Sequence, residues 1–381
     1  MLLSPRVQKI LRKFEAQHLL RKRDAIDKKK LVVSFSSNDY LNIAKHPDVI
    51  KAYQHGAEEC GLGSGAAPLV SGYTKSHQQL EEAFAEFLNR DKALLLNSGY
   101  HANLGVITTF ADRSTTVIAD KLCHASLIDG IVLSRAKHKR YHHHDMSQAE
   151  RLLREHQHQD TLLITESVFS MQGDIANVKK LSALAKNNQA LLIVDDAHGI
   201  GVLGNRGGGI CDYYQLSQQE VPCLITPFGK ALGSFGAMVT GKADLIEALV
   251  QCARTYRYST ALPPAVCQAT LAALKILTHE SWRRSQLQHL ITFFITEAKS
   301  RNLPLASFDA TPIKSVVIGS NKATLDMQTK LMASGFFVSC IRPPTVPVNQ
   351  ACVRLSLNCT HTEEQIIRLL DLMAEHHEFK N

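Results

Sequence analysis

Two polar side chains stand directly after an apolar run in the middle of the chain. The run ALLIVD (190–195) has the length and composition of a buried strand, and it leads into VDDAHGIG with Asp195 and His198. A buried carboxylate needs a cation or strong hydrogen bonds. A protonated pyridine nitrogen is such a cation, and His198 could hydrogen-bond the phenolic oxygen of the same ring. A turn-capping Asp and a core His explain this short pattern equally well when it is taken alone.

A lysine lies in a glycine-rich segment further along the chain. Lys230 occurs in TPFGKALGSFGA (226–237), between two apolar runs. Lysine is rarely buried without a partner, and one held in such a turn is a candidate Schiff-base nucleophile. Taken alone, an ordinary surface lysine is the better explanation. In combination with the strand–Asp–x–x–His pattern, the segment favours a pyridoxal cofactor bound to Lys230.

Two further segments offer contacts for the rest of such a cofactor. In NSGYHAN (97–103), Ser98, Gly99 and Tyr100 precede a predicted helix, and the N–H groups of a helix N-terminus can bind a phosphate. Tyr100, or His124 in DKLCHASL, could lie flat against the pyridine ring. For a lone histidine such as His124, a helix cap or a place in the core is the default interpretation.

A fourth segment, TESVFSMQGD (165–174), follows another apolar run, TLLITE (161–166). Glu166 and Ser170 stand just past the end of that predicted strand. The hydroxyl of Ser170 could contact the ring oxygen of the cofactor. The Gly-Asp pair at the end of the segment indicates a turn on its own.

The elements that must position these side chains alternate between strands and helices. This alternation predicts an α/β fold with a mainly parallel, doubly wound sheet, in which ligands bind at the carboxyl ends of the strands. The predicted strands are 93–97, 115–119, 161–166 and 190–195, and the predicted helices are 101–110, 126–135, 147–157 and 177–187.

The pattern changes after about residue 263, where long helical segments run to about residue 299. Strands at 313–318, 336–341 and 352–357 and helices at 323–333 and 363–376 then indicate a smaller α+β domain. The predicted divisions are an N-terminal helix and arm (1–40), a large cofactor-binding domain (41–275) and a small C-terminal domain (276–381).

Composition limits the class of protein. The net charge of +8 fits nucleic acid, anionic small substrates, an acidic partner or merely a basic surface, and no nucleic-acid-binding motif supports the first. Nine scattered cysteines without a CxxC pair predict reduced thiols. No signal peptide or membrane-spanning run is found, so a cytoplasmic protein is expected. His142, His143 and His144 follow a strand-like KRY and are interpreted as a solvated strand end, with no metal site expected.

Taken together, these segments closely resemble the α-oxoamine synthase family, within the aspartate-aminotransferase-like fold (fold type I) of pyridoxal-phosphate enzymes. The matching pieces span nearly the whole chain in the family's order. They are SSNDYL (36–41), GSG (63–65), VSGY (70–73), SGY (98–100), HASL (124–127), TESVFSMQGD, VDDAHGIG, FGKALG and YSTALPP (258–264).

The resemblance implies a role for each matching residue. Lys230 would carry pyridoxal 5'-phosphate and move protons, Asp195 would pair with the pyridine nitrogen, and His124 would stack on the ring. Arg354 would bind the amino-acid carboxylate, a bidentate task that suits arginine. The remaining implied contacts are His198 and Ser170 to the ring hydroxyl, Ser98, Gly99 and Tyr100 to the phosphate, Asn38 to the amino acid, and Arg21 or Arg23 to the far end of the acyl chain.

Within the family, IRPPTVP (341–347) with VRLSL (353–357) is most similar to the branch that condenses L-alanine with a pimeloyl thioester in biotin synthesis. The resemblance also implies a homodimer with shared active sites, in which Ser259 or Thr260 faces the partner's phosphate site. The acyl group could arrive on coenzyme A or on a carrier protein.

The sequence departs from the family at three places. One is the segment before SSNDYL, which is shorter than usual and leaves the choice between Arg21 and Arg23 open. The family's phosphate-binding Thr or Ser, three residues before the lysine, is replaced by Pro227, which has neither hydroxyl nor N–H. Thr226 is the adjacent candidate. The loop at 66–69 reads AAPL, which is stiffer and less polar than the family's Ser/Thr and Gly.

Three rival functions follow from the same residues. One is a sister synthase that uses glycine or serine with another acyl thioester; the IRPPTVP segment is the only sequence feature that argues against it. The second is a lyase or transaminase of the same fold; the HASL and SGY segments argue against it. The third is a non-catalytic relative that acts as a scaffold, which the substitution at Pro227 and the altered loop keep open.

Overall fold

The computed structural model describes residues 4–21, 23, 25 and 33–375, and these form two compact units. The large unit contains residues 38–170 and 175–285, and the small unit contains the described residues of 1–37, 171–174 and 286–381. The division therefore falls within helix α12 (Trp282–Ser300), about ten residues after the end predicted for the large domain. The domain limits 1–40, 41–275 and 276–381 stay predictions.

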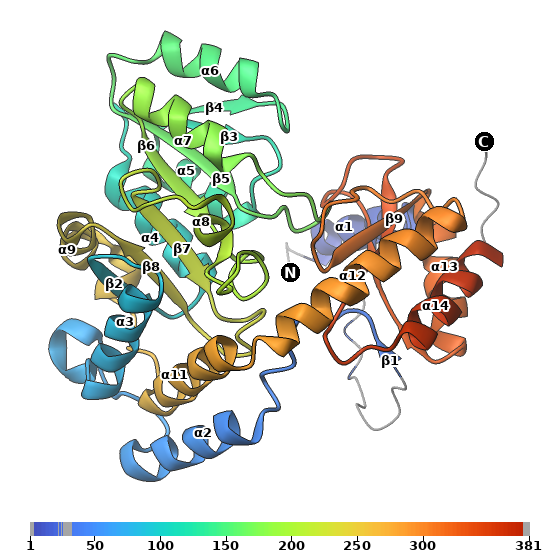
Figure 1. Cartoon of the computed structure of the whole chain (residues 1–381). Helices are drawn as coiled ribbons and strands as arrows, with labels where there is room; N and C mark the ends of the chain where they lie inside the picture. The colour runs from blue at the N-terminus through green and yellow to red at the C-terminus, as the bar shows by residue number, and fades with distance from the viewer. Residues whose placement is uncertain (1–3, 22, 24, 26–32, 376–381) are drawn as a thin grey trace. The chain divides into compact units, whose positions relative to one another are not determined.

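A seven-stranded sheet forms the centre of the large unit (Figure 1). Its strand order is β2-β8-β7-β6-β5-β3-β4, and β8 is antiparallel to both of its neighbours while the other pairs are parallel. The strands are β2 (Lys92–Leu96), β3 (Thr116–Asp120), β4 (Lys137–Tyr141), β5 (Thr161–Glu166), β6 (Leu191–Asp195), β7 (Cys223–Pro227) and β8 (Ala237–Gly241). The predicted α/β fold with a mainly parallel sheet is confirmed.

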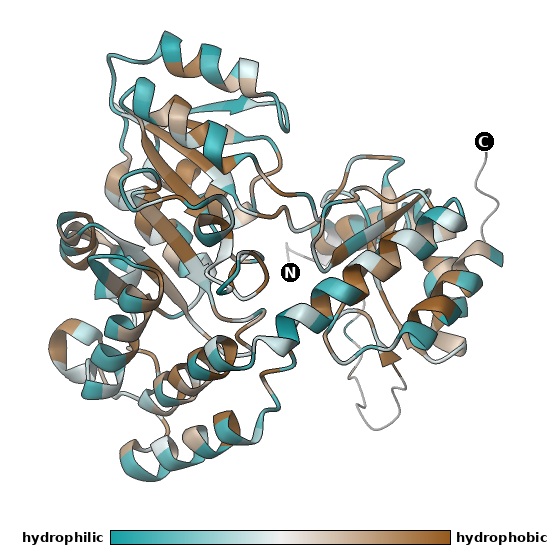
Figure 2. Cartoon of the chain, viewed as in Figure 1, coloured by the Kyte–Doolittle hydropathy of each residue, from teal (hydrophilic) through white to brown (hydrophobic). Residues whose placement is uncertain are grey.

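Apolar strands explain why this sheet is buried. Every residue of β3 and β5 is buried, and the strands at the centre of the sheet are the most hydrophobic part of the unit (Figure 2). Parallel strands covered by helices on both faces have this near-continuous apolar composition. One face packs against α4, α5, α9 and α10 in a single hydrophobic cluster, which includes Val106, Leu127 and Leu249.

Helices follow the strands, and several begin at a polar cap. Ser98 caps α4, His124 caps α5 and Asn177 caps α7, each by accepting a backbone N–H of the first turn. The other helical elements of the large unit lie around them. The bounds are α2 (Pro47–Cys60), η1 (Pro68–Gly72), α3 (Lys75–Phe87), α4 (Gly99–Phe110), α5 (Ala125–Ser134), α6 (Met146–Glu155), α7 (Val178–Asn187), α8 (Gly209–Tyr214), α9 (Ala243–Cys252), α10 (Arg254–Arg257) and α11 (Pro264–His279).

The small unit has an α+β architecture. Strands β11 (Ser339–Ile341), β12 (Ala351–Ser356) and β9 (Ile313–Gly319) form an antiparallel sheet, and β1 (Val33–Ser34) pairs with β10 (Phe336–Phe337). Its helices are α1 (Ser4–Ala16), α13 (Asn321–Ala333), α14 (Glu363–Glu375) and most of α12. Among the described residues, no helix combines the length and the apolar composition needed to cross a bilayer.

Candidate active site

The chemically interesting residues of the large unit gather where parallel strands end. Glu166 ends β5, Asp195 ends β6 and Pro227 ends β7. Glu166 and Asp195 are register partners on neighbouring strands, and Asp195 is the register partner of Ile225 on β7. Because these strands are parallel, the segments that follow them start from one edge of the sheet, as the sequence pattern predicts.

Asp195 is a buried carboxylate held by two hydrogen bonds. Its Oδ1 accepts the backbone N–H of Ala197 at 3.1 Å, and its Oδ2 accepts a side-chain N–H of Asn103 at 2.7 Å. No lysine, arginine or histidine of the described chain forms an ion pair with it. A buried carboxylate of this kind is suited to a cationic ligand group such as a protonated ring nitrogen.

A chain of hydrogen bonds connects Asp195 to His124. Asn103 donates to the hydroxyl of Ser126 at 2.8 Å, and that hydroxyl lies 2.7 Å from Nδ1 of His124. The backbone N–H of Ser126 also donates to this Nδ1, so Nδ1 is the acceptor and Nε2 carries the proton. The two residues predicted to lie at the ring nitrogen and on the ring face are thus joined through α4 and α5.

His198 and Asn38 are brought together by a tyrosine. Nδ1 of His198 lies 2.7 Å from the hydroxyl of Tyr40, and the same hydroxyl donates to Oδ1 of Asn38 at 3.3 Å. Tyr40 and His198 are both buried. Neither Tyr40 nor Asn103 was singled out by sequence reasoning, although both lie inside the segments SSNDYL and NSGYHAN. A polar residue among the apolar positions of a buried face was the available signal for Asn103.

Lys230 lies in the turn that joins β7 to β8. Its carbonyl accepts the N–H of Gly233 at 2.8 Å, and the turn is closed by a bond from the N–H of Phe228 to Gly236. Gly233 has a φ of +59°, and a Cβ there would lie 2.3 Å from the backbone nitrogen of Ala44, so glycine is required. The Nζ of Lys230 makes no hydrogen bond or ion pair with any described residue, which leaves the amine available for covalent chemistry.

The pKa of Glu166 is shifted by its burial and by the charged residues at this edge of the sheet. Burial and the negative charge of Asp195 raise the pKa of Glu166 well above its ordinary value, and the positive charge of Lys230 partly opposes this rise. Both causes favour the protonated form of the Glu166 carboxyl. One of its oxygens is buried without a hydrogen-bond partner among the described residues.

The N-terminus of α4 offers backbone donors. Ser98 accepts the N–H of His101, whereas the N–H groups of Gly99 and Tyr100 have no partner within the helix. A Cβ at Gly99 would lie 2.6 Å from Cγ of Pro227, so glycine allows the end of β7 to approach the helix closely. Tyr100 is exposed and its hydroxyl donates to Asp129.

The geometry argues against Thr226 as a replacement for the hydroxyl missing at Pro227. Alternate residues of a strand point to opposite faces, so the contact of Pro227 with the start of α4 directs Thr226 to the other face. The Thr226 hydroxyl is buried there and has no hydrogen-bond partner among the described residues. A phosphate at α4 would be held by backbone N–H groups and Ser98.

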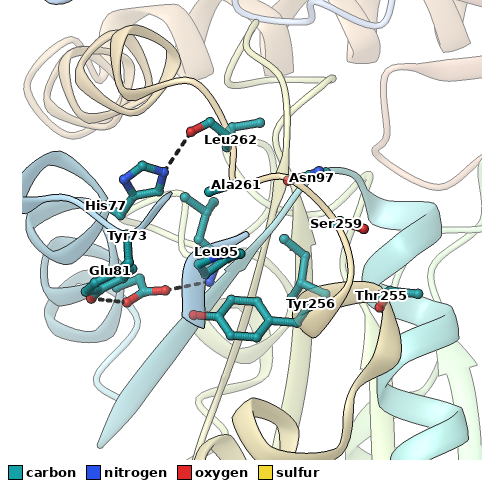
Figure 3. A pocket seen from close by; sticks show the side chains of 12 residues that line it. Tyr73, His77, Glu81, Leu95, Asn97, Thr255, Tyr256, Ser259, Ala261 and Leu262 are labelled. Atoms are coloured by element: carbon teal, nitrogen blue, oxygen red, sulfur yellow. Dashed lines mark hydrogen bonds between the residues drawn. The ribbon is translucent and has the colours of Figure 1, made fainter. Parts of the chain in front are cut away.

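Three other predicted residues also lie in the large unit. Ser170 is half-buried, four residues past the end of β5. Ser259 and Thr260 lie beside the start of α4, where Asn97 donates to the carbonyl of Thr260 at 2.8 Å. Ser259 and Asn97 line one pocket with Glu81 (Figure 3).

The predicted substrate arginines belong to the small unit. Arg354 is buried in the central strand β12 and donates to the hydroxyl of Ser356 at 3.0 Å. Arg21 donates to the hydroxyl of Thr345 at 3.1 Å, which links it to the IRPPTVP segment, and Arg23 is exposed. The roles of Arg21, Arg23 and Arg354 in substrate binding stay predictions.

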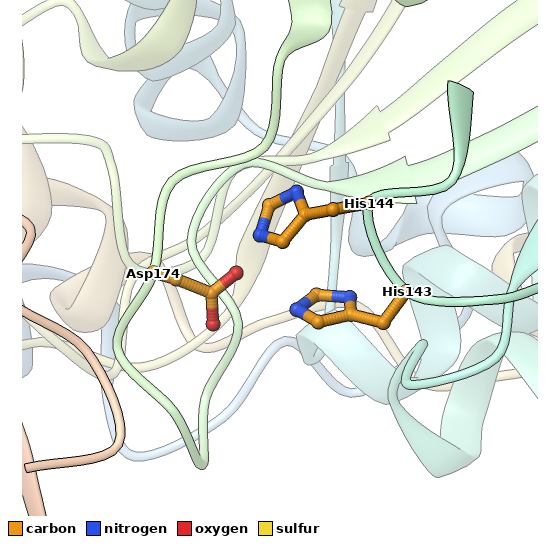
Figure 4. A group of neighbouring side chains, drawn as sticks. All are labelled: His143, His144 and Asp174. Atoms are coloured by element: carbon orange, nitrogen blue, oxygen red, sulfur yellow. The ribbon is translucent and has the colours of Figure 1, made fainter. Parts of the chain in front are cut away.

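Of the three histidines after β4, His142 and His144 are exposed, as a solvated strand end predicts, whereas His143 is half-buried and makes specific contacts. Nδ1 of His143 lies 3.1 Å from both carboxylate oxygens of Asp120, and its ring meets the ring of Phe169 edge-on. Figure 4 shows His143 with His144; Asp174, which is also drawn, belongs to the small unit. The contacts with Asp120 and Phe169 tie the segment after β4 to the ends of β3 and β5.

The family of the chain follows from comparison with known proteins. The family model "Aminotransferase class I and II" matches residues 30–372. Together with the mainly parallel sheet and the residues at its strand ends, this match defines the class of protein, a class I and II aminotransferase-family enzyme.

The relatives refine this class. Proteins named 8-amino-7-oxononanoate synthase are similar over most of their length: that of Stutzerimonas stutzeri is 45% identical over 94% of this chain and 94% of its own, and that of Pseudomonas putida (strain GB-1) is 47% identical over 90% and 88%. The solved 8-amino-7-oxononanoate synthase of Francisella tularensis is 35% identical with a TM-score of 0.81, covering 90% of this chain and 97% of that chain. The chain belongs to the 8-amino-7-oxononanoate synthase family.

A second solved structure shows how far the fold extends beyond this family. Serine palmitoyltransferase of Sphingomonas wittichii has a TM-score of 0.90 and 25% identity, over 98% of this chain and 96% of that chain. The predicted fold and family are confirmed.

Proposed function

We propose that this chain catalyses the decarboxylative condensation of L-alanine with a pimeloyl thioester to give 8-amino-7-oxononanoate, a step of biotin synthesis, with pyridoxal 5'-phosphate as cofactor. The relatives' shared name supports the reaction. Within the structure, the observation that carries the proposal is the hydrogen-bonded chain from Asp195 to His124, at the sheet edge where Lys230 influences the charge state of Glu166.

The donor set fits the cofactor. Asp195 offers a buried carboxylate to the ring nitrogen, the first turn of α4 offers N–H groups to the phosphate, and Lys230 offers a free amine to the aldehyde. His124 would lie on the ring face. When bound, the cofactor supplies an electron sink for the carbanion chemistry that the reaction requires.

The chain's own residues would hold the substrates and move protons. Lys230 Nζ is the base for the Cα proton of alanine, and Nε2–H of His124 donates to the thioester carbonyl oxygen. Arg354 binds the alanine carboxylate, and Arg21 binds the far carboxylate of the pimeloyl group. The condensation forms one carbon–carbon bond and releases the thiol and carbon dioxide.

We extend the proposal to the assembly and its location. The chain forms a homodimer with shared active sites, in which Ser259 or Thr260 contributes to the partner's phosphate site. All nine cysteines are unpaired, which supports a cytoplasmic location. No role in nucleic-acid or membrane binding is proposed.

A product assay tests the proposed function. The purified protein is incubated with pimeloyl-coenzyme A, or with pimeloyl carrier protein, and with alanine, glycine or serine in separate reactions, and the products are identified by mass spectrometry. We expect 8-amino-7-oxononanoate from alanine, and the faster of the two thioesters identifies the carrier. Product from glycine or serine but not from alanine would instead show a sister synthase, and no product with cofactor bound would contradict the proposal.

A further inference from the structure

A small pocket in the large unit lies beside the N-terminus of α4 and contains a half-buried acid (Figure 3). Its polar lining comes from α3, from the end of β2 and from the segment before α11. Glu81 of α3 is the carboxylate, with Tyr73, His77, Asn97 and Tyr256 around it. None of these residues has a role in the proposed chemistry.

Both carboxylate oxygens of Glu81 are used. Oε2 accepts the hydroxyl of Tyr73 at 2.7 Å, and Oε1 accepts the backbone N–H of Leu95 at 2.8 Å. Strand β2 is an edge strand, paired only with β8, so the outward N–H of Leu95 has no strand to bond with. Glu81 thus supplies the acceptor that a neighbouring strand would otherwise give to the N–H of Leu95. Leu95 lies two residues before Asn97 and three before Ser98.

The same face of α3 also contacts the segment before α11, at Leu262. His77 lies one turn before Glu81; its Nδ1 accepts the N–H of Thr74, so Nε2–H donates to the carbonyl of Leu262 at 2.7 Å. Asn97, at the end of β2, joins the two segments directly, because its side chain donates to the carbonyl of Thr260. Helix α3 therefore anchors the two segments that flank the N-terminus of α4.

We infer that Glu81 is a positioning residue: by holding the end of β2 and the Tyr73 segment, it sets the N-terminus of α4 at the position in which its N–H groups bind the cofactor phosphate. The inference rests on the proposed function, because it needs a phosphate at α4. Glu81 itself touches neither the phosphate nor the reacting atoms.

The charge of Glu81 makes this positioning depend on pH. Burial raises the pKa of Glu81 to about 7, although the bonds from Tyr73 and Leu95 lower it. Hydrogen bonds to an ionised carboxylate are the stronger ones, so the hold weakens as Glu81 takes up a proton. The titratable groups that face it from the packed elements are Tyr73, Glu82 and His77, Tyr256 of α10 and Cys267 of α11; burial raises the pKa of Tyr256 and Cys267 and lowers that of His77.

Titration of the cofactor-free full-length protein with pyridoxal phosphate tests the inference. Glu81→Ala should weaken binding about tenfold or more, because two charge-assisted hydrogen bonds are lost. Glu81→Gln keeps an acceptor for Leu95 and a donor for Tyr73, and should bind within about threefold of the parent. The matched control is Glu82→Ala, since Glu82 is exposed and, among the described residues, its side chain accepts from Gln78 alone; it should bind as the parent does.

Two further arms decide between outcomes. Tyr73→Phe removes the hydrogen bond to Glu81 and should give an intermediate loss of cofactor affinity. Because Tyr73 is exposed, this variant should fold even if Glu81→Ala does not. Between about pH 8 and pH 6, the parent should lose more affinity than Glu81→Gln, whose amide does not titrate. Parent-like binding by both Glu81→Ala and Tyr73→Phe, or equal losses in Glu81→Ala and Glu81→Gln, would overturn the inference. Failure of the parent itself to capture the cofactor on Lys230 would refute the proposed function instead.

Discussion

At the scale of single residues, the site depends on how the carboxylate of Asp195 is hydrogen-bonded while it is buried. Its two hydrogen bonds come from a backbone N–H and from Asn103, and the second continues through Ser126 to His124. Asn103 thus supports both the residue proposed for the ring nitrogen and the one proposed for the ring face. Its removal should affect binding and folding together.

Asn103→Ala is expected to leave a buried carboxylate oxygen without its side-chain donor. The cost of such a loss is about 1–3 kcal/mol of folding free energy. Denaturant unfolding of the cofactor-free protein measures it, and cofactor affinity should fall as well. The control is Asn97→Ala, whose bond to Thr260 is exposed and which should cost less. Equal stability of Asn103→Ala and the parent would show that Asp195 does not depend on this bond.

Glu166 gives a pH-dependent prediction at the same scale. Burial and Asp195 raise its pKa in the folded chain, so above the ordinary pKa of a glutamate the folded state binds more protons than the unfolded state. Folding stability from this group therefore falls as pH rises. Glu166→Gln, which cannot ionise, should gain stability relative to the parent from about pH 5 to pH 8.

The control for Glu166 has the opposite sign. Hydrogen bonds from Ser217 lower the pKa of Glu220, so its ionised form stabilises the folded chain above the ordinary pKa of glutamate. Glu220→Gln should lose stability relative to the parent as pH rises through that value. Denaturation midpoints of cofactor-free protein across a pH series measure both variants. A constant difference between Glu166→Gln and the parent at all pH values would contradict the raised pKa.

At the scale of elements, the close approach of β7 to the start of α4 is the feature that most constrains the phosphate site. Gly99→Ala would place a methyl group 2.6 Å from Cγ of Pro227, so the helix or the strand end must move. Cofactor affinity should fall by about tenfold or more, the effect of roughly 1.4 kcal/mol. Gly63→Ala, which meets nothing within 4 Å and has an ordinary φ, is the control. Unchanged cofactor binding by Gly99→Ala would show that the phosphate is held elsewhere.

The elements also show what sequence reasoning could and could not reach. Strands β5 and β6 were predicted within one residue because they are long apolar runs bounded by polar residues. Strand β4, KHKRY, is an edge strand with mostly exposed polar side chains, so no apolar run marks it and only its last three residues, KRY, are recognised as strand-like from the sequence. Strands β7 and β8 flank the predicted lysine turn as an antiparallel pair, which a simple strand–helix alternation does not anticipate.

The contacts between residues of the site could not be predicted from the sequence, for a different reason. Asp195, His198, His124 and Lys230 stand next to strand ends and glycines, so local patterns mark them. The bond between Tyr40 and His198 spans 158 positions, and that between Asn103 and Asp195 spans 92. No local periodicity encodes such pairs; only the completed sheet brings them together.

At the scale of the whole molecule, the proposed homodimer with shared sites predicts complementation between inactive chains. A Lys230→Ala chain keeps Ser259 and Thr260, and a Ser259→Ala/Thr260→Ala chain keeps Lys230. Mixed dimers would regain one intact site. After unfolding and refolding as an equal mixture, activity should reach about a quarter of the parent's, since half of the dimers are mixed and each has one of two sites.

Two controls frame that experiment. Each variant refolded alone should stay far below the mixture, and sedimentation of the parent should give twice the mass of one chain. Recovery no greater than the sum of the separate variants would mean that the sites are not shared. A parent that sediments as a single chain would contradict the dimer itself.

Covalent trapping of the cofactor tests whether Lys230 is the residue that carries it. The protein is loaded with pyridoxal phosphate, reduced with borohydride, digested, and searched by mass spectrometry for the modified peptide. We expect one modified residue, Lys230. In Lys230→Ala, both this modification and the absorbance band at the edge of the visible range should disappear. Modification at another lysine, or a Lys230→Ala protein that keeps both the band and turnover, would contradict it.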